Sequence, residues 1–184
     1  MMTANRLGSR AVAHETDPVD PGSLRAVMRG FATGVTVVAT ADEDRTFAAV
    51  VNSFTSVSLA PPLILVCLKV GSRTCAAIER RGFFSVCVLA DDHRRHSERL
   101  ARSQPTVDDE AFEFAHGLPV IRDAPAGLLC RVDSTLVKGD HVIVIGCVVA
   151  TKLAERDPLL FYNGQYRVLP GQGVADAGST ASAK

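Results

Sequence analysis

Short apolar runs rich in β-branched residues recur along this chain, and tight turn signals separate several of them. The runs stand at 35–41, 46–52, 63–68, 83–89, 127–138, 141–153, 159–162 and 165–169. Gly139-Asp140 joins the two longest runs. Asn163-Gly164, the dipeptide that most favours a two-residue hairpin turn, joins the last two. Because parallel strands need long crossover connections, strands joined by such turns predict an antiparallel sheet.

Helical patterns are fewer than strand patterns. Pro21 stands near the start of one, Ser72 caps a second, and a charged third runs from Asp91 through Arg102. A doubly wound fold would alternate strands and helices throughout, and the second half of this chain lacks that alternation. We therefore expect a mostly β fold with inserted helices, in which an antiparallel sheet closes on itself as a split barrel.

The chain divides by composition into one domain and two flanking segments. Its 184 residues suit a single domain whose core needs no staples. Residues 1–20 are expected to form a flexible N-terminal segment, and the Gly-, Ala- and Ser-rich residues 170–184 a disordered tail. This leaves 21–169 as the folded domain.

Composition also narrows the classes of function. The formal net charge is +0, so no basic face for nucleic acid is expected. The apolar runs are about half the length that crosses a bilayer, and the N-terminus lacks a secretory signal, so we expect a cytoplasmic protein that does not bind membranes. The five cysteines include no CxxC pair, which predicts buried free thiols; Cys75, in the first turn of a helix, is the candidate for a reactive thiol instead.

One strand-length stretch, 52–59, is unusually polar. Four of its eight residues carry hydroxyls and one carries an amide. Short hydroxyls and exposed backbone N–H groups suit a flat, polyanionic ligand, because they can approach it closely. The alternative is an edge strand that runs into a loop. Pro61-Pro62 follows, and we expect the chain to leave the sheet there because proline cannot join a central ladder.

Two shorter motifs offer further contacts. Ser72-Arg73-Thr74 combines a helix N-terminus with a guanidinium group, which makes a phosphate site or, alternatively, a plain cap with a surface arginine. Gly139-Asp140-His141 is a turn that delivers a histidine, either to a site or to the surface. His93 and His96 share one helix face with arginines between them, and we interpret them as a solvated basic face rather than metal ligands.

Together these motifs resemble the short-chain flavin reductase family, the NAD(P)H:flavin oxidoreductases that serve two-component flavin-dependent monooxygenases. The resemblance covers about residues 22–169. It rests on Thr33-Gly34-Val35-Thr36, Asn52-Ser53-Phe54-Thr55-Ser56-Val57-Ser58-Leu59 with Pro61-Pro62, Ser72-Arg73-Thr74, Gly139-Asp140-His141, and the closing Tyr162 and Tyr166. The resemblance implies a flavin-binding split barrel, a homodimer, and hydride transfer from NADH or NADPH to FMN or FAD.

The resemblance also implies which residues form the site. Cofactor contacts are expected from Thr33, Gly34, Val35, Thr36, Asn52, Ser53, Phe54, Thr55, Ser56, Val57, Ser58, Ser72, Arg73, Thr74, Gly139, Asp140 and Tyr166. Residues 52–58 would face the isoalloxazine and ribityl chain, residues 72–74 would hold phosphate, and His141 would take the catalytic position beside the nicotinamide. Relatives often have Gly-Met-Thr where this chain has Ala48-Ala49-Val50, so Val50 lacks the hydroxyl that threonine would offer to the flavin.

The residue types agree with that chemistry. Hydride transfer between two stacked rings needs no side-chain nucleophile and no obligatory base, so the protein supplies orientation and a polar cradle. A non-catalytic flavin-binding or carrier protein, and an enzyme like pyridoxamine-phosphate oxidase, are the alternatives. NADH oxidation in the presence of free flavin distinguishes the reductase from the carrier.

Overall fold

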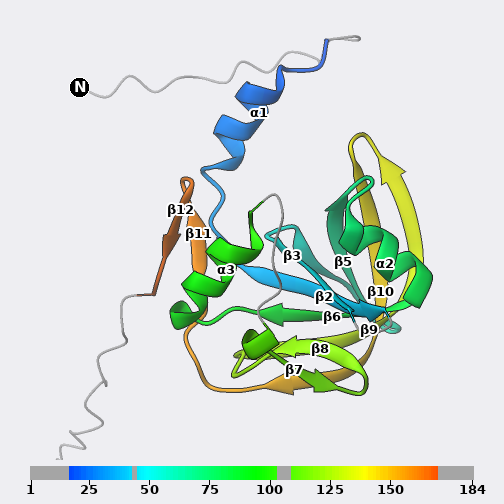
Figure 1. Cartoon of the computed structure of the whole chain (residues 1–184). Coiled ribbons are helices and arrows are strands. Elements are labelled where there is room, and N and C mark those ends of the chain that lie inside the picture. Colours follow the sequence, from blue (N-terminus) through cyan, green and yellow to red (C-terminus); the bar gives the residue numbers. More distant parts are fainter. Residues whose placement is uncertain (1–16, 43–44, 103–108, 170–184) are drawn as a thin grey trace, which may run out of the picture.

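The structure, a computed structural model, describes residues 17–42, 45–102 and 109–169 (Figure 1). Its helices are α1 (Pro21–Met28), α2 (Arg73–Arg81) and α3 (Arg94–Leu100), with the 3-10 turns η1 (Asp91–His93) and η2 (Asp109–Ala111). Its strands are β1 (Thr33–Gly34), β2 (Thr36–Asp42), β3 (Arg45–Val51), β4 (Phe54–Leu59), β5 (Pro62–Lys69), β6 (Phe83–Val88), β7 (Phe112–Ala115), β8 (Leu118–Ile121), β9 (Ala126–Lys138), β10 (His141–Leu153), β11 (Leu160–Tyr162) and β12 (Gln165–Arg167). The expected mostly β fold with inserted helices is confirmed.

Seven strands form the main sheet, in the order β3-β2-β6-β9-β10-β5-β4, and all their pairings are antiparallel. The two end strands, β3 and β4, follow one another in the sequence and are joined only by Asn52 and Ser53. Three Cα–Cα steps span at most about 11 Å, so the sheet must curl until its two edges lie close together. The link 52–53 therefore lies where those edges meet.

The expectation that the chain leaves the sheet at Pro61-Pro62 is wrong. Pro62 opens β5 and pairs with Leu59 at the end of β4, so the prolines form a hairpin. The first position of a strand tolerates proline. β4 is an edge strand, as the alternative interpretation of the polar stretch expects.

Both faces of the sheet are buried, each against its own core. Successive residues of β2 point to opposite faces, so Val37 joins one apolar cluster with Phe112 and Leu159, and Val38 joins the other with Ile78. The first cluster includes the small β7–β8 sheet and the second includes α2. Continuous apolar runs such as 35–41 are explained by this two-sided burial.

The β7–β8 hairpin has no counterpart in the sequence-based prediction. Its strands have four residues each, and its turn uses His116 and Gly117, both with positive φ (50° and 76°). A histidine in the left-handed region is uncommon, so the dipeptide lacks the signal that Asn163-Gly164 carries. The Asn163-Gly164 hairpin is confirmed, and it pairs β11 with β12.

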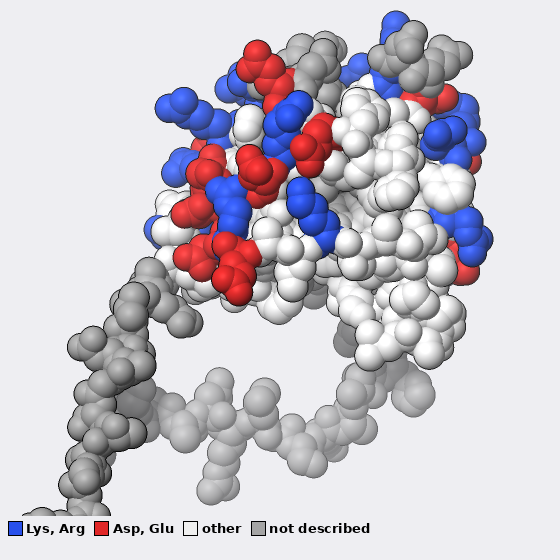
Figure 2. Space-filling model, turned by 90° about the horizontal axis from the view of Figure 1, so that it is seen from below, with Lys and Arg blue, Asp and Glu red and all other residues white. Residues whose placement is uncertain are grey.

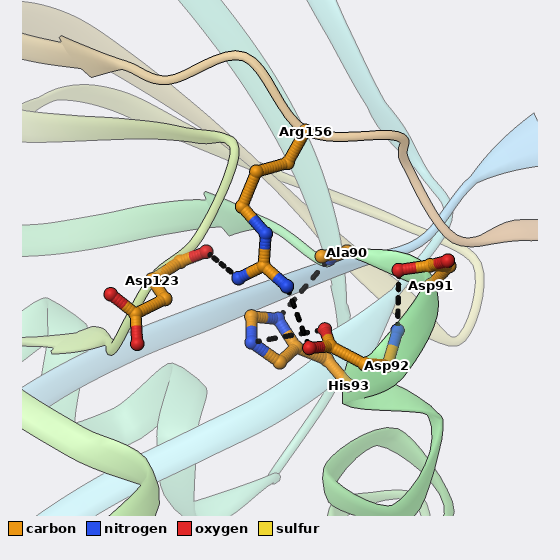
Figure 3. A network of polar contacts seen from close by, with 6 residues as sticks. All are labelled: Ala90, Asp91, Asp92, His93, Asp123 and Arg156. Carbon is orange, nitrogen blue, oxygen red and sulfur yellow. Dashed lines mark hydrogen bonds and ion pairs between the residues drawn. The ribbon is translucent and has the colours of Figure 1, made fainter.

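His93 is not part of a solvated face, which corrects the expectation. The η1 turn precedes α3 and brings His93 inside, where it is 7% exposed and its Nδ1 accepts the Ala90 N–H at 3.2 Å (Figure 3). Arg156 donates to the Asp92 carboxylate at 2.6 Å and to the Asp123 carbonyl. This network ties the start of α3 to two other segments, one after β8 and one after β10.

Charges of both signs lie intermixed on the face shown in Figure 2, next to a broad uncharged area. No one-sign patch dominates that face, in line with the net charge of +0. None of the helices among the described residues is long and apolar enough to span a membrane. The expected tail 170–184, most of the N-terminal segment 1–20 and residues 103–108 lie outside the described residues.

Candidate functional site

A cavity of about 200 Å³ lies at the junction of the two sheet edges. Its lining residues are Val35, Val50, Val51, Asn52, Ala101, Phe161 and Tyr166. A second hollow, of about 300 Å³, shares Asn52 and Phe161 with the first and extends along α1 past Arg25 and Arg29. The two hollows adjoin at Asn52 and Phe161, and we refer to them together as the groove.

Val35 lines this groove, and hydrogen bonds from residues 33–36 hold the surrounding strands together. The Val35 N–H donates to the Leu159 carbonyl at 3.2 Å, and the Thr36 hydroxyl donates to the Val51 carbonyl at 2.8 Å. β1, which contains Gly34, pairs with β11. The Thr33 hydroxyl oxygen is buried and has no partner among the described residues. A buried hydroxyl without a partner is rare, and a polar ligand atom at this place would satisfy it.

The polar stretch divides into a structural half and an exposed half. The Ser53 hydroxyl both accepts from the Cys67 N–H and donates to the Cys67 carbonyl, each at 3.0 Å, so it fastens the sheet edge to β5. Phe54 and Ser58 are half-buried, and the three residues between them, 55–57, are exposed along the edge. A register shift between Ser56 and Ser58 leaves Val57 out of the ladder. This half presents polar groups to solvent, as a ligand surface requires.

The N-terminus of α2 has the predicted cap. The Ser72 hydroxyl accepts the Cys75 N–H at 3.3 Å, Arg73 is exposed and Thr74 is buried. Nine residues follow the cap before the left-handed Gly82 ends the helix. The exposed guanidinium at a helix N-terminus is the arrangement that binds phosphate.

The Gly139-Asp140-His141 turn lies beside that helix terminus. His141 pairs with Lys69 across the β5–β10 ladder, and the Val70 N–H donates to the Asp140 carbonyl at 3.0 Å. Three motifs thus meet at the end of β5. Ser53 hydrogen-bonds to Cys67, the histidine turn pairs with Lys69, and the α2 cap follows β5 directly in the sequence. Tyr166 and Val35 line the cavity on the other side of Asn52.

The His141 side chain is about half exposed (47%), and its Nδ1 lies 2.8 Å from the Asp140 carboxylate. The hydrogen bond from His141, with the attraction between the two groups, lowers the pKa of Asp140 below its ordinary value. The carboxylate orients the ring and leaves Nε2 available to a ligand.

Several lining residues have no counterpart in the sequence-based prediction. Phe161 lines the cavity, and so do Val51 and Ala101. Val50 also lines the cavity, so the departure from threonine leaves an apolar wall at that position. The Asn163-Gly164 turn places Phe161 opposite Tyr166 in the β11–β12 pair, so this dipeptide was a sequence signal from which the position of Phe161 could have been predicted.

The thiols do not contribute an obvious nucleophile. All five cysteines are free, and Cys75 is buried. Burial, and secondarily the nearby Glu79, raises the pKa of the Cys75 thiol, so the helix terminus does not yield a thiolate and the reactive alternative is not supported. Among residues 17–42, 45–102 and 109–169, no group of three or more His, Cys, Asp or Glu side chains could hold a metal ion.

The curled antiparallel sheet and its groove define a class of protein. Aromatic and aliphatic walls suit a flat ring, the edge-strand hydroxyls suit a polar chain, and Arg73 suits a phosphate. These features are suited to a flat, phosphate-bearing cofactor bound on a sheet-dominated scaffold.

Comparison with known proteins narrows this class. Residues 28–170 match the family model of the flavin reductase like domain, and the chain belongs to that family. The reductase subunit HsaB of a flavin-dependent monooxygenase from Rhodococcus jostii is 37% identical over 162 residues, which cover 86% of this chain and 82% of that protein.

Solved structures agree with the sequence comparison. The flavin reductase PheA2 superposes with a TM-score of 0.77 at 36% identity, over 83% of this chain and 100% of that one. The NADH:FAD oxidoreductase SgcE6 of Streptomyces globisporus C-1027, in complex with NAD and FAD fragments, also gives 0.77, at 31% identity over 90% and 100% of the two chains. The chain is thus an oxidoreductase of the flavin reductase type, which confirms the family resemblance and the predicted enzyme class.

Proposed function

We propose that this protein transfers hydride from NADH to FMN or FAD and supplies the reduced flavin to a partner flavin-dependent monooxygenase. The observation that carries the proposal is the convergence of Ser53, His141 and the α2 N-terminus at the end of β5, next to the Asn52 groove. The names of the relatives support NADH as the donor and a monooxygenase as the partner.

The residues present fit a bound flavin. The buried, unpartnered Thr33 hydroxyl and the exposed hydroxyls of 55–56 supply polar contacts, and the Arg73 guanidinium supplies a cation for phosphate. When bound, the flavin supplies the hydride acceptor. The chain's own residues bind and orient the flavin. Asn52 lines both hollows of the groove, so its amide can contact a ligand in either one.

His141 has a positioning role in this proposal. Its Nε2 would hydrogen-bond to the nicotinamide nucleotide, while Asp140 holds the ring. It is not required to move a proton, because the transferred species is a hydride. The contacts expected from His141 therefore bind the nicotinamide nucleotide and align it with the flavin.

Three further features belong to the proposal. The folded unit would span 21–169, close to the family match at 28–170. Two copies would form a homodimer. The five free thiols, of which three are buried, favour the reducing cytoplasm.

An anaerobic stopped-flow assay tests the function. We expect NADH to reduce added FMN or FAD in the presence of the protein, with one flavin preferred. Flavin binding without NADH oxidation would instead indicate a carrier. Oxidation of pyridoxamine 5′-phosphate, without reduction of free flavin by NADH, would indicate the oxidase-like alternative.

A further inference from the structure

Ser97 on α3 holds the aromatic wall of the groove. Its side chain is fully buried (0% exposed), and its hydroxyl lies 2.7 Å from the hydroxyl of Tyr166 on β12. Serine has low helix propensity in mid-helix and gains little by burial, so a buried serine usually has a specific hydrogen-bond partner. Here that partner is a residue that lines the cavity.

The Tyr166 ring is held on other sides as well. The Arg94 guanidinium carbon, on the preceding turn of α3, lies 5.7 Å from the ring centroid, and Glu98 holds that guanidinium at 2.7 Å. Phe161 meets the ring edge-on, with centroids 5.4 Å apart. These contacts define the tilt of the ring, because a hydroxyl bond, a cation and a second ring act on it from different directions.

The helix α3, which carries Ser97 and Arg94, is itself fixed by tertiary contacts. The buried His93 and the Arg156–Asp92 ion pair anchor the η1 turn, which leads directly into α3, to the body of the protein (Figure 3). Ser97 and Arg94 are three residues apart, so they lie on one helix face. A change at Ser97 would therefore remove one of the three contacts that hold the ring and leave the helix in place.

We propose that Ser97 is a positioning residue that fixes the Tyr166 ring as a flat wall for the flavin. With its hydroxyl engaged by Ser97, Tyr166 offers the cavity a ring surface beside Val35 and Val50. Such a surface fits a planar heterocycle, whereas a freely rotating tyrosine would lose conformational entropy on binding. This proposal rests on the proposed function, since it takes the groove as the flavin site.

The test compares Ser97→Ala, Tyr166→Phe and the double variant by flavin fluorescence titration and steady-state NADH oxidation. Each single variant loses one hydrogen bond, and we expect the flavin Kd and KM to rise about three- to tenfold, with kcat at saturating flavin retained. The double variant should bind no worse than the single variants, because all three lack the same bond. Ser97→Thr keeps the hydroxyl and should restore most of the affinity.

Ser85→Ala is the matched control. Ser85 is also fully buried, and its hydroxyl lies within hydrogen-bond distance of the Ala39 and Pro119 carbonyls, in the core rather than at the groove. It should lower the melting temperature and leave the flavin Kd unchanged. A wild-type Kd in Ser97→Ala, additive losses in the double variant, or an equal loss in Ser85→Ala would each overturn the proposal.

Two further results distinguish failure of a variant to fold, or failure of the proposed function, from failure of the Ser97 proposal. If Ser97→Ala does not fold, Tyr166→Phe tests the same bond with the ring retained. If the wild-type protein neither binds flavin nor oxidises NADH with it, the proposed function fails first, before any variant is compared.

Discussion

Arg73 and His141 are exposed side chains beside the end of β5, and we propose that both contact the ligand. Both are on the surface, so neither is explained by folding. An exposed guanidinium such as that of Arg73 costs little free energy when unbound and forms a charge-assisted hydrogen bond when a phosphate reaches it.

Replacement of Arg73 by alanine should weaken FMN binding about ten- to a hundredfold, the effect of losing a charge-assisted hydrogen bond. Riboflavin, which has no phosphate, should bind almost equally to the variant and to the wild type. Arg80→Ala is the control, since Arg80 lies at the other end of α2 and pairs with Asp42 at 2.7 Å. Fluorescence titration of both ligands measures the effect, and equal weakening of both would contradict the phosphate role.

His93 gives the protein a pH-dependent stability. Burial, with help from Arg156 and His96, lowers the pKa of His93 below its ordinary 6.5, although Asp92 and Asp123 oppose the shift. The Nδ1 that accepts from Ala90 cannot do so when protonated. The unfolded chain therefore binds the proton more readily, and the stability present above about pH 6.5 is lost as the pH falls through that value towards the pKa of the folded state.

His93→Gln tests this coupling, because an amide can accept the Ala90 N–H without titrating. The melting temperature of the wild type should fall more than that of the variant between about pH 8 and about pH 5.5. Parallel curves for the two proteins would show that other groups cause the acid sensitivity.

At the scale of the element, β10 shows why one position must remain glycine. A Cβ built at Gly146 would lie 2.5 Å from Cζ of Phe84 and 3.0 Å from Cβ of Cys130, and both neighbours are fully buried. The sheet passes close over the core there, and the ladder with β9 changes register next to this residue. Close packing against an immobile ring leaves no room for a methyl group.

Gly146→Ala should lower the free energy of unfolding by about 1–3 kcal/mol, the usual effect of overpacking. Gly127→Ala on the neighbouring strand β9 is the control, since its nearest atom would be Cβ of Lys152 at 4.0 Å, and its effect should stay within about 0.5 kcal/mol. Urea denaturation measures both. A similar stability for the two variants would mean that β10 shifts to accommodate the methyl group.

At the scale of the whole molecule, one chain leaves much apolar surface uncovered. No residue of α1 is buried, and Val27 and Phe31 are 75% and 65% exposed. Leu59 at the end of β4 is 89% exposed. Apolar side chains of this size usually mark an interface when they gather on one element.

We expect a homodimer of about twice the 19.5 kDa chain mass at micromolar concentration. Light scattering coupled to size exclusion measures it, and Val27→Glu should weaken the assembly if α1 is covered by the second copy. Gln165→Glu, an exposed polar position on β12, is the control for added charge. A monomer in the wild type would refute the dimer.

Much of this protein follows from local sequence. The Asn163-Gly164 hairpin, the Ser72 cap with Gly82 at the other end of α2, and the long β9–β10 pair form because neighbouring residues favour those turns and caps. Local energetics act within a few residues, so a single sequence contains them. The family motifs added the site residues by resemblance rather than by geometry.

Only the tertiary structure decided which of these parts meet. The approach of His141 to the α2 cap depends on the β5–β10 register, and the burial of His93 depends on segments around Asp123 and Arg156. The Ser97–Tyr166 bond likewise joins a helix to a distant strand. Such contacts arise from packing between segments far apart in the chain, and no local preference of Ser97, His93 or His141 specifies them.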